Sequence, residues 1–453
     1  MSSNGKHKTE LDAITAITVA GFKSINNEQT IEVRPLTILA GANSSGKSSF
    51  IQALLLLKQT VELSFDAGPL CLSGPNAKFS SFADILFGAS KNPGSSDSVF
   101  SVSIQINQSQ VISIDYGRVE DEIQILKCSY SGLPNSEDVT LRHGQEPYPF
   151  HPSAKHVELI DVFGMLLGPG ELGPGELGPG KKYRSCLRDQ CFLIPAIQIQ
   201  GGESTLELPQ GLSDRFKGPI QKVLHLPGLR GAPERAYPKS SYGPEFPGTF
   251  ESYTASVLAH WQHHSTAQFA GVVRDLQHLG LTSRMRASPL DDTRVELRVG
   301  RLPQSTEDDL INISDVGLGV SQVLPVIVAC HVAKPGQMVY VEQPEIHLHP
   351  KAQFRLAKIL VDAANRGVRL VVETHSSLLL LGIQAAVAEG KLEPSKVQLN
   401  WFERNQTTGA TVVTSRDLDE AGRFGDWPTD FDDVTLRAQA DYLDAAEAAL
   451  ARK

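Results

Sequence analysis

The stretch GANSSGKS, residues 41–48, constrains the fold of this chain more than any other feature. The residues before it, TILA, are typical of a buried strand, and the apolar run Ala53–Leu57 lies in a helix expected from about Lys47 to Lys58. Glycines let the backbone curl so that its N–H groups face an anion, and the helix dipole adds attraction. The pattern therefore predicts a phosphate-binding loop, lined by Gly41, Asn43, Ser44, Ser45, Gly46, Lys47, Ser48 and Ser49.

Two side chains of this loop and one distant acid have predicted roles. Lys47 should reach the β- and γ-phosphates of a nucleotide, and the Ser48 hydroxyl should ligate Mg²⁺. Glu342 directly follows the apolar run Met338–Val341, where a buried strand presents a carboxylate to the metal. The expected cofactors are therefore ATP and Mg²⁺.

The next position, which usually carries the acid that activates water, is Gln343. An amide can orient water but cannot take its proton, so we expect slow hydrolysis and a long-lived ATP-bound state. Glu345, two residues on, is the obvious substitute base. The alternative that Glu345, or a residue of a partner subunit, restores ordinary turnover stays open.

Two further motifs complete the set of candidate site residues. His375, in ETHSS after the apolar run VRLVV, can hydrogen-bond the γ-phosphate or the attacking water; the alternative is a capping or core histidine. DVGLGVSQ, residues 315–322, is a glycine turn at a helix N-terminus and can hold an anion. A second such turn makes sense if it closes over the nucleotide of another subunit, and the alternative is an ordinary helix cap.

Hydrophobic periodicity indicates an α/β fold. Residues 14–41 predict two strands and a connection, and residues 99–130 alternate in three pieces, as in an antiparallel meander. Residues 251–281 have helical spacing. After them, apolar strands ending near Glu342 and His375 alternate with helices, one of them starting at Pro350, which indicates a mostly parallel sheet covered by helices. A hairpin over VQLNWFER and ATVVTS should close the sheet, and an amphipathic helix should end the chain.

Composition excludes several classes of protein. The 453 residues carry a net charge of −9, which argues against a broadly basic nucleic-acid-binding surface. Cys186 and Cys191 lack the spacing and partners of a zinc site, and His260, His263 and His264 are explained by a solvated polar face. The GPGEL repeat in residues 166–180 predicts a surface-loop expansion. No apolar run approaches the ~20 residues of a membrane span, and no signal peptide is evident, so a cytoplasmic protein without a membrane partner is expected.

The order of these motifs resembles that of ABC-type ATPases. GFKSI, LTILAGANSSGKSS, PEIHLHP and ETHS are similar to the soluble SMC/RecF/OLD-like branch, of the AAA15 type. The resemblance implies an ABC-type P-loop NTPase head: an N-terminal half in 1–130, an irregular insertion in 131–255, a C-terminal half in 256–415 and a helical tail in 416–453. It also implies a homodimer or higher homo-oligomer around ATP, in which the signature contacts, made in trans, come from Gly317, Gly319, Ser321 and Gln322.

Departures from that pattern shape the functional hypotheses. No heptad arm separates the two halves, and the 78 residues after His375 leave no room for the Toprim nuclease domain of the OLD and Gabija proteins. The first hypothesis is an ATPase that regulates a separately encoded nuclease or toxin in a bacterial anti-phage defence module. The second is a RecF-like ATPase that grips DNA in repair or clamping, for which the basic residues of 214–239 would supply contacts; nucleic-acid binding is left open.

Overall fold

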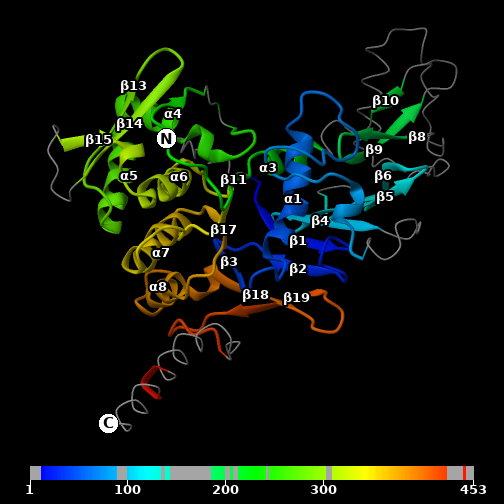
Figure 1. Ribbon diagram of the computed structural model, residues 1–453. Helices are drawn as coiled ribbons and strands as arrows, with labels where there is room; N and C mark the ends of the chain where they lie inside the picture. The colour runs from blue at the N-terminus through cyan, green and yellow to red at the C-terminus, as the bar shows by residue number, and fades with distance from the viewer. Residues whose placement is uncertain are drawn as a thin grey trace, which may run out of the picture. The chain divides into compact units, whose positions relative to one another are not determined.

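The structure is a computed structural model, drawn in Figure 1. It describes residues 12–88, 99–133, 138–142, 185–198, 205–207, 213–240, 243, 245–301, 309–425 and 442–444. The GPGEL repeat and all but three residues of the expected C-terminal helix lie outside these ranges. The chain divides into two compact units: unit 1 comprises residues 1–10, 32–48 and 223–453, and unit 2 comprises residues 11–31 and 49–222.

The main sheet of unit 1 has six strands and is mostly parallel. Its order is β11-β16-β17-β3-β18-β19, in which every neighbouring pair from β11 to β18 is parallel and β18–β19 is an antiparallel hairpin. Parallel neighbours end at the same edge of a sheet, so the carboxyl ends of β3, β16 and β17 lie together. The strands are β11 (Leu224–Leu226), β16 (Met338–Glu342), β17 (Arg369–Glu373), β3 (Leu36–Gly41), β18 (Val397–Arg404) and β19 (Thr411–Asp417).

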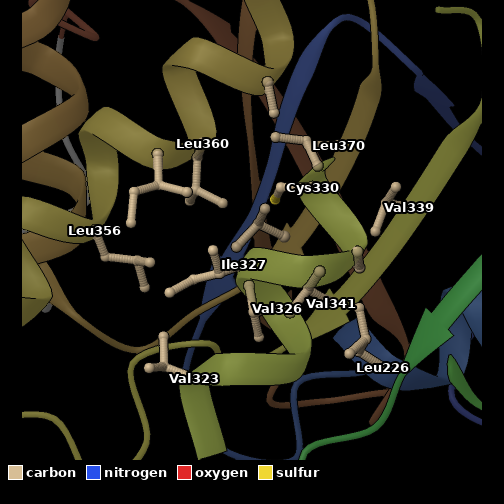
Figure 2. Packing of buried hydrophobic residues seen from close by; sticks show 14 of the residues in the cluster. Leu226, Val323, Val326, Ile327, Cys330, Val339, Val341, Leu356, Leu360 and Leu370 are labelled. Carbon is tan, nitrogen blue, oxygen red and sulfur yellow. The ribbon is translucent and has the colours of Figure 1, made fainter. Parts of the chain in front are cut away.

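One face of this sheet packs against helices through a large apolar core. Figure 2 shows Val326 and Ile327 of α6 beside Val339 and Val341 of β16, with Leu360 of α7 nearby. The helices are α4 (Thr254–His264), α5 (Thr266–Leu279), α6 (Leu318–Val332), α7 (Pro350–Asn365) and α8 (Ser377–Ala388), and the short 3-10 turns are η2 (Phe250–Tyr253), η4 (Ile313–Asp315) and η5 (Pro394–Lys396).

A smaller antiparallel sheet adjoins α4 in unit 1. Its order is β12-β14-β13, with β15 paired to β14. Two of its strands, β12 and β15, have only two and three residues and carry too little alternation to be predicted from sequence. The strands are β12 (Tyr237–Pro238), β13 (Met285–Pro289), β14 (Arg294–Gly300) and β15 (Leu310–Asn312).

Unit 2 contains the predicted meander and a second, smaller sheet. The six-stranded sheet runs β2-β1-β4-β5-β6-β7, with β10-β9-β8 as the smaller sheet. The hydroxyls of Tyr116 and Tyr130 in the meander donate to the backbone carbonyls of residues 191 and 193, which lie just before and within β9 of the smaller sheet. The elements are β1 (Ile14–Ala20), β2 (Gln29–Glu32), β4 (Phe100–Ile106), β5 (Gln110–Val119), β6 (Glu122–Ser131), β7 (Val139–Arg142), β8 (Ser185–Asp189), β9 (Phe192–Gln198), β10 (Thr205–Glu207), η1 (Phe82–Ile85) and α3 (Asp214–Gln221); α1 (Lys47–Val61) begins in unit 1 and continues here.

The predicted α/β fold class is confirmed, with a mostly parallel sheet, an antiparallel meander and a helical insertion. Two boundaries differ from expectation. The helical stretch 251–281 is interrupted at Ser265, whose backbone dihedral angles are not helical. The Ser265 N–H donates to the Trp261 carbonyl and so ends α4. Strand β17 ends at Glu373 and not at His375, because the next residues turn to meet a carboxylate from β16's loop. No helix among the described residues is long and apolar enough to cross a membrane.

Candidate nucleotide site

Glycine is required at the start of the loop that joins β3 to α1. Gly41 has a φ of 140°, and a Cβ atom there would lie 2.3 Å from the carbonyl oxygen of Phe402 on β18. The loop is also held from its other side, because Arg404 donates to the Ser44 carbonyl (2.9 Å) and Thr411 to the Ser45 carbonyl (2.7 Å). The β18–β19 hairpin therefore fixes the shape of the loop.

The Lys47 side chain lies over this loop. Its Nζ donates to the carbonyl oxygens of Gly41 (3.0 Å) and Ala42 (2.8 Å). Burial lowers the pKa of Lys47, and the charge of Glu373 opposes that shift. The Ser45 hydroxyl is buried and has no hydrogen-bond partner among the described residues. Because buried polar atoms normally have partners, a buried ammonium and an orphaned hydroxyl in a curled backbone fit an anionic ligand.

Two carboxylates stand side by side at the carboxyl edge of the sheet. Glu342 of β16 pairs in register with Glu373 of β17, so both side chains leave the same face of the sheet. The Ser48 hydroxyl donates to Glu373 Oε1 (2.9 Å), and the Tyr340 hydroxyl donates to Glu373 Oε2 (3.0 Å). The hydroxyl expected to ligate the metal therefore bonds to an acid that the sequence analysis did not single out.

Glu342 is held from the opposite side. The His225 ring nitrogen Nε2 lies 3.3 Å from its Oε1, and the Gly228 N–H donates to its Oε2 at 3.0 Å. His225 also stacks on Tyr340, with ring centroids 5.4 Å apart. The carboxylate is thus fixed by residues from β11 and the turn after it.

These surroundings shift the two carboxyl pKa values in opposite directions. Burial acts to raise the pKa of Glu342, but the bonds from His225, Gly228 and Tyr340 outweigh it, and the pKa is lowered. Burial raises the pKa of Glu373; the Ser48 bond opposes this, and the neighbouring charge of Glu342 adds to it. Glu373 is therefore the more easily protonated member of the pair.

The turn after β16 and the turn after β17 are tied together by Glu345. Its Oε1 accepts from the Thr374 hydroxyl (2.8 Å) and the His375 N–H (2.9 Å), while Oε2 has no partner among the described residues. Burial raises the pKa of Glu345. Burial lowers the pKa of His375, and the charge of Lys47 lowers it further, so its ring stays neutral near pH 7. Gln343 has a positive φ of 43°, and its N–H donates to the Glu373 carbonyl at 2.7 Å.

Arg230, from the segment LRGAPERAYP, joins the signature helix to the end of β16. It is 8% exposed, and its Nη1 donates to the Gln322 carbonyl at 3.1 Å. Its Nη2 donates to the carbonyls of Glu342 and Gln343. One guanidinium thus holds three backbone carbonyls from two elements.

The signature segment begins α6, with Gly317 at the N-cap position. A Cβ atom at Gly317 would meet nothing within 4 Å, whereas one at Gly319 would lie 3.2 Å from the His347 carbonyl oxygen. Leu318 is 42% exposed. The Ser321 hydroxyl donates to the Leu318 carbonyl, whereas the Gln322 side chain is buried and donates to Gly231 at 2.8 Å. Both the side chain and the carbonyl of Gln322 are therefore bonded to residues 230 and 231 of the same chain, and Gln322 faces its own subunit.

These residues fit the binding of Mg²⁺ with a nucleotide. Mg²⁺ is held in proteins by one or two carboxylates together with substrate phosphates, and Ser48, Glu373 and Glu342 offer a hydroxyl and two carboxylates at one sheet edge. Within the described ranges, no group of three or more His, Cys, Asp or Glu side chains could hold a metal by itself. A cation here would be coordinated jointly by these side chains and by the phosphates of the nucleotide.

Sequence reasoning missed Glu373, Tyr340, His225 and Arg230. Glu373 carried a signal, because it follows the apolar run VRLVV as Glu342 follows MVYV. His225 and Arg230 lie on and just after β11, a three-residue strand whose pairing with β16 has no signature in the sequence. Tyr340 bonds to Glu373 only because β16 pairs with β17.

Comparisons with known proteins were made for the sequence and for the fold. Among solved structures, an SMC head domain bound to the C-winged helix domain of ScpA matches with a TM-score of 0.47 and 15% identity, covering 90% of this chain and 99% of that one. The SMC head domain from Thermotoga maritima matches with a TM-score of 0.39 and 11% identity, covering 89% of this chain and 98% of that one. An SMC head domain from Pyrococcus furiosus bound to the C-terminal domain of ScpA matches with a TM-score of 0.43 and 12% identity, covering 90% of this chain and 97% of that one. No curated protein matched.

Two protein-family models match separate parts of the chain. Residues 13–160 match the family described as an AAA ATPase domain, and residues 274–381 match the family described as an AAA domain, putative AbiEii toxin, type IV TA system. The first match contains the phosphate-binding loop, and the second contains Glu342 and His375. Two separate parts of the chain are therefore similar to AAA domains, which confirms the predicted resemblance to the AAA15-type ATPases.

Proposed function

We propose that this chain binds MgATP at residues 41–49 and hydrolyses it slowly. The observation that carries the proposal is the meeting of Lys47 and Ser48 with the paired acids Glu342 and Glu373 at one edge of the parallel sheet. The loop N–H groups and Lys47 would hold the phosphates, and the hydroxyl and carboxylates would hold Mg²⁺. The two AAA family matches support the same activity.

Slow turnover follows from the residues available to activate water. Gln343 cannot act as a base, and general-base catalysis is typically worth about 10²–10⁴-fold in rate. Glu345 has one carboxylate oxygen engaged by Thr374 and His375, which favours a positioning role for it. In this role Glu345 holds the His375 backbone, so that the neutral His375 ring stays at the γ-phosphate. Because hydrolysis is slow, the ATP-bound state lasts long enough to act as a signal.

ATP would also join two subunits. Gly317, Gly319 and Ser321 lie at the start of α6. A Cβ atom at Gly317 would meet nothing within 4 Å, and the neighbouring Leu318 is 42% exposed. A helix N-terminus with exposed backbone N–H groups can meet the phosphates of a nucleotide held by another copy. The buried Gln322 would support this turn from within its own subunit.

The biological role we propose is regulation of a separately encoded nuclease or toxin in a bacterial anti-phage defence module, in the cytoplasm. The family matched by residues 274–381, described as a putative AbiEii toxin of a type IV TA system, supports a link to toxin–antitoxin biology.

The second hypothesis, a RecF-like DNA-gripping ATPase, loses support in residues 214–239, whose basic side chains were expected to contact DNA. There Lys217 pairs with Asp189, Arg235 pairs with Asp315, and Arg230 is buried.

Calorimetric titration with ATP and Mg²⁺ tests the nucleotide site. Lys47→Ala should weaken binding at least tenfold, because it removes the charge that meets the phosphates. Lys358→Ala is the matched control, because this exposed lysine on α7 pairs with Asp362, one turn away. Unchanged affinity in a folded Lys47→Ala protein would overturn the assignment.

Cysteine crosslinking tests ATP-dependent pairing. Cysteines introduced at Asn43 and Ser321 should crosslink between chains when ATP is present. A bulky residue at Gly317, where a Cβ atom meets nothing within 4 Å, should prevent this while leaving ATP binding intact. Crosslinks that form only within one chain contradict the arrangement. Purification of the chain with the products of neighbouring genes would then identify the effector.

A further inference from the structure

We propose that Glu373 is a metal-holding residue of the site, sharing the Mg²⁺ of MgATP with Ser48 and Glu342. The inference rests on the proposed function and adds to it a second carboxylate, which comes from the strand that precedes His375. When the cation enters, it would replace the Ser48 hydroxyl as the partner of Glu373 Oε1, while Oε2 keeps its bond from Tyr340.

Strand register places the carboxylates where one cation can meet both. Glu342 and Glu373 are direct partners in the parallel ladder, on strands that end at the same edge. Glu373 pairs on its other side with Leu39 of β3, two residues before Gly41 and the phosphate-binding loop. The Ser48 hydroxyl, 2.9 Å from Glu373 Oε1, confirms that the first turn of α1 reaches this carboxylate.

Charge balance is the second argument. Like charges at directly opposite positions of a sheet destabilise it. Here each carboxylate has one positively charged or ionisable neighbour: Glu342 has His225, and Glu373 has the nearby ammonium of Lys47. When Lys47 turns toward phosphates, Glu373 loses that partner. A divalent cation between the acids and the phosphates would restore the balance.

The alternative is a purely structural role, in which Glu373 only accepts hydrogen bonds from Ser48 and Tyr340. Glutamine at this position keeps one accepting oxygen, and its NH₂ can donate to the hydroxyl on the other side, since a hydroxyl accepts as well as donates; the side chain carries no charge. Glu373→Gln therefore separates metal binding from hydrogen bonding. Glu389→Gln, the same change at an exposed position after α8, is the matched control.

The experiment measures the dissociation constant of the ATP analogue AMP-PNP by calorimetry, in buffer with MgCl₂ and in buffer with EDTA. The ratio of the two constants reports the metal's contribution and does not depend on hydrolysis. Glu373→Gln should lower this ratio at least tenfold, and its metal-free affinity should equal or exceed that of the unaltered protein, because one negative charge no longer faces the phosphates. Glu342→Gln should lower the ratio as well, and Glu389→Gln should not.

The outcomes separate the two proposals. A ratio unchanged by Glu373→Gln, with the whole metal effect lost in Glu342→Gln, overturns the role of Glu373 and leaves nucleotide binding intact. Absence of AMP-PNP binding in both buffers overturns the proposed function itself. Should Glu373→Gln fail to fold, Glu373→Asp keeps the charge and withdraws it by one methylene; a ratio equal to that of the unaltered protein then refutes the proposal.

Discussion

Replacing Arg230 with alanine should destabilise unit 1 by about 3 kcal/mol. The guanidinium donates to the carbonyls of Gln322, Glu342 and Gln343, and hydrogen bonds to charged groups contribute about 1.5–3 kcal/mol each. Burial offsets part of this gain, since it lowers the pKa of Arg230 to about 10, and each unit of pKa shift corresponds to about 1.4 kcal/mol. The difference of these terms is of the order of 3 kcal/mol.

Urea denaturation followed by tryptophan fluorescence measures this loss, and thermal unfolding should show it as a decrease of about 6–12 °C in Tm. Arg235→Ala is the control from the same segment. That arginine is 74% exposed and pairs with Asp315 at the surface, where an ion pair contributes less than about 1 kcal/mol. Arg230→Lys should recover part of the loss, because it keeps the charge and lacks the planar fork. If Arg230→Ala cost no more than Arg235→Ala, the buried guanidinium would not be holding these carbonyls together.

Three further changes address catalysis, pH dependence and backbone strain. In single-turnover assays Gln343→Glu should speed ATP hydrolysis at least tenfold if an absent base limits the rate, whereas loss of the remaining hydrolysis in Glu345→Gln would make Glu345 the base. In metal-free buffer Glu373→Gln should raise Tm at pH 8, because a raised carboxyl pKa means that the folded state favours the neutral form of Glu373. The stabilising contribution of protonated Glu373 is full below about pH 4 and is lost as pH rises, so the Tm values of Glu373→Gln and the unaltered protein should converge at acidic pH. Gly41→Ala should lower Tm far more than Gly390→Ala, since both need positive φ but only the first meets a carbonyl, at 2.3 Å.

The sequence predicted the parts of the site that lie within one continuous motif. GANSSGKS was placed between its strand and helix, and the apolar runs before Glu342 and Glu373 were recognised as strands of a parallel sheet. These features depend on local patterns, in which glycine conformation and hydrophobic periodicity act over a few residues.

The missing parts depend on register between strands that are distant in sequence. That Glu373 stands opposite Glu342 follows from the pairing of β16 with β17, which no local pattern encodes. The side chain of Gln322 faces inward because Gly231 offers it a carbonyl, and residue 231 lies 91 positions away. Glu345 was singled out as a base, yet its contacts with the turn after β17 are visible only once the two turns are brought together.

The two hydrogen bonds from Lys47 to its own loop have a consequence for which anions can enter. The carbonyls of Gly41 and Ala42 act as internal competitors for the ammonium, so an incoming ligand must displace them. A single phosphate ion gains few contacts in exchange. A triphosphate gains the loop N–H groups along its whole length, and its charge outcompetes two neutral oxygens. The loop therefore selects for polyphosphate length before any base or sugar is recognised, and free phosphate should be a weak inhibitor of nucleotide binding.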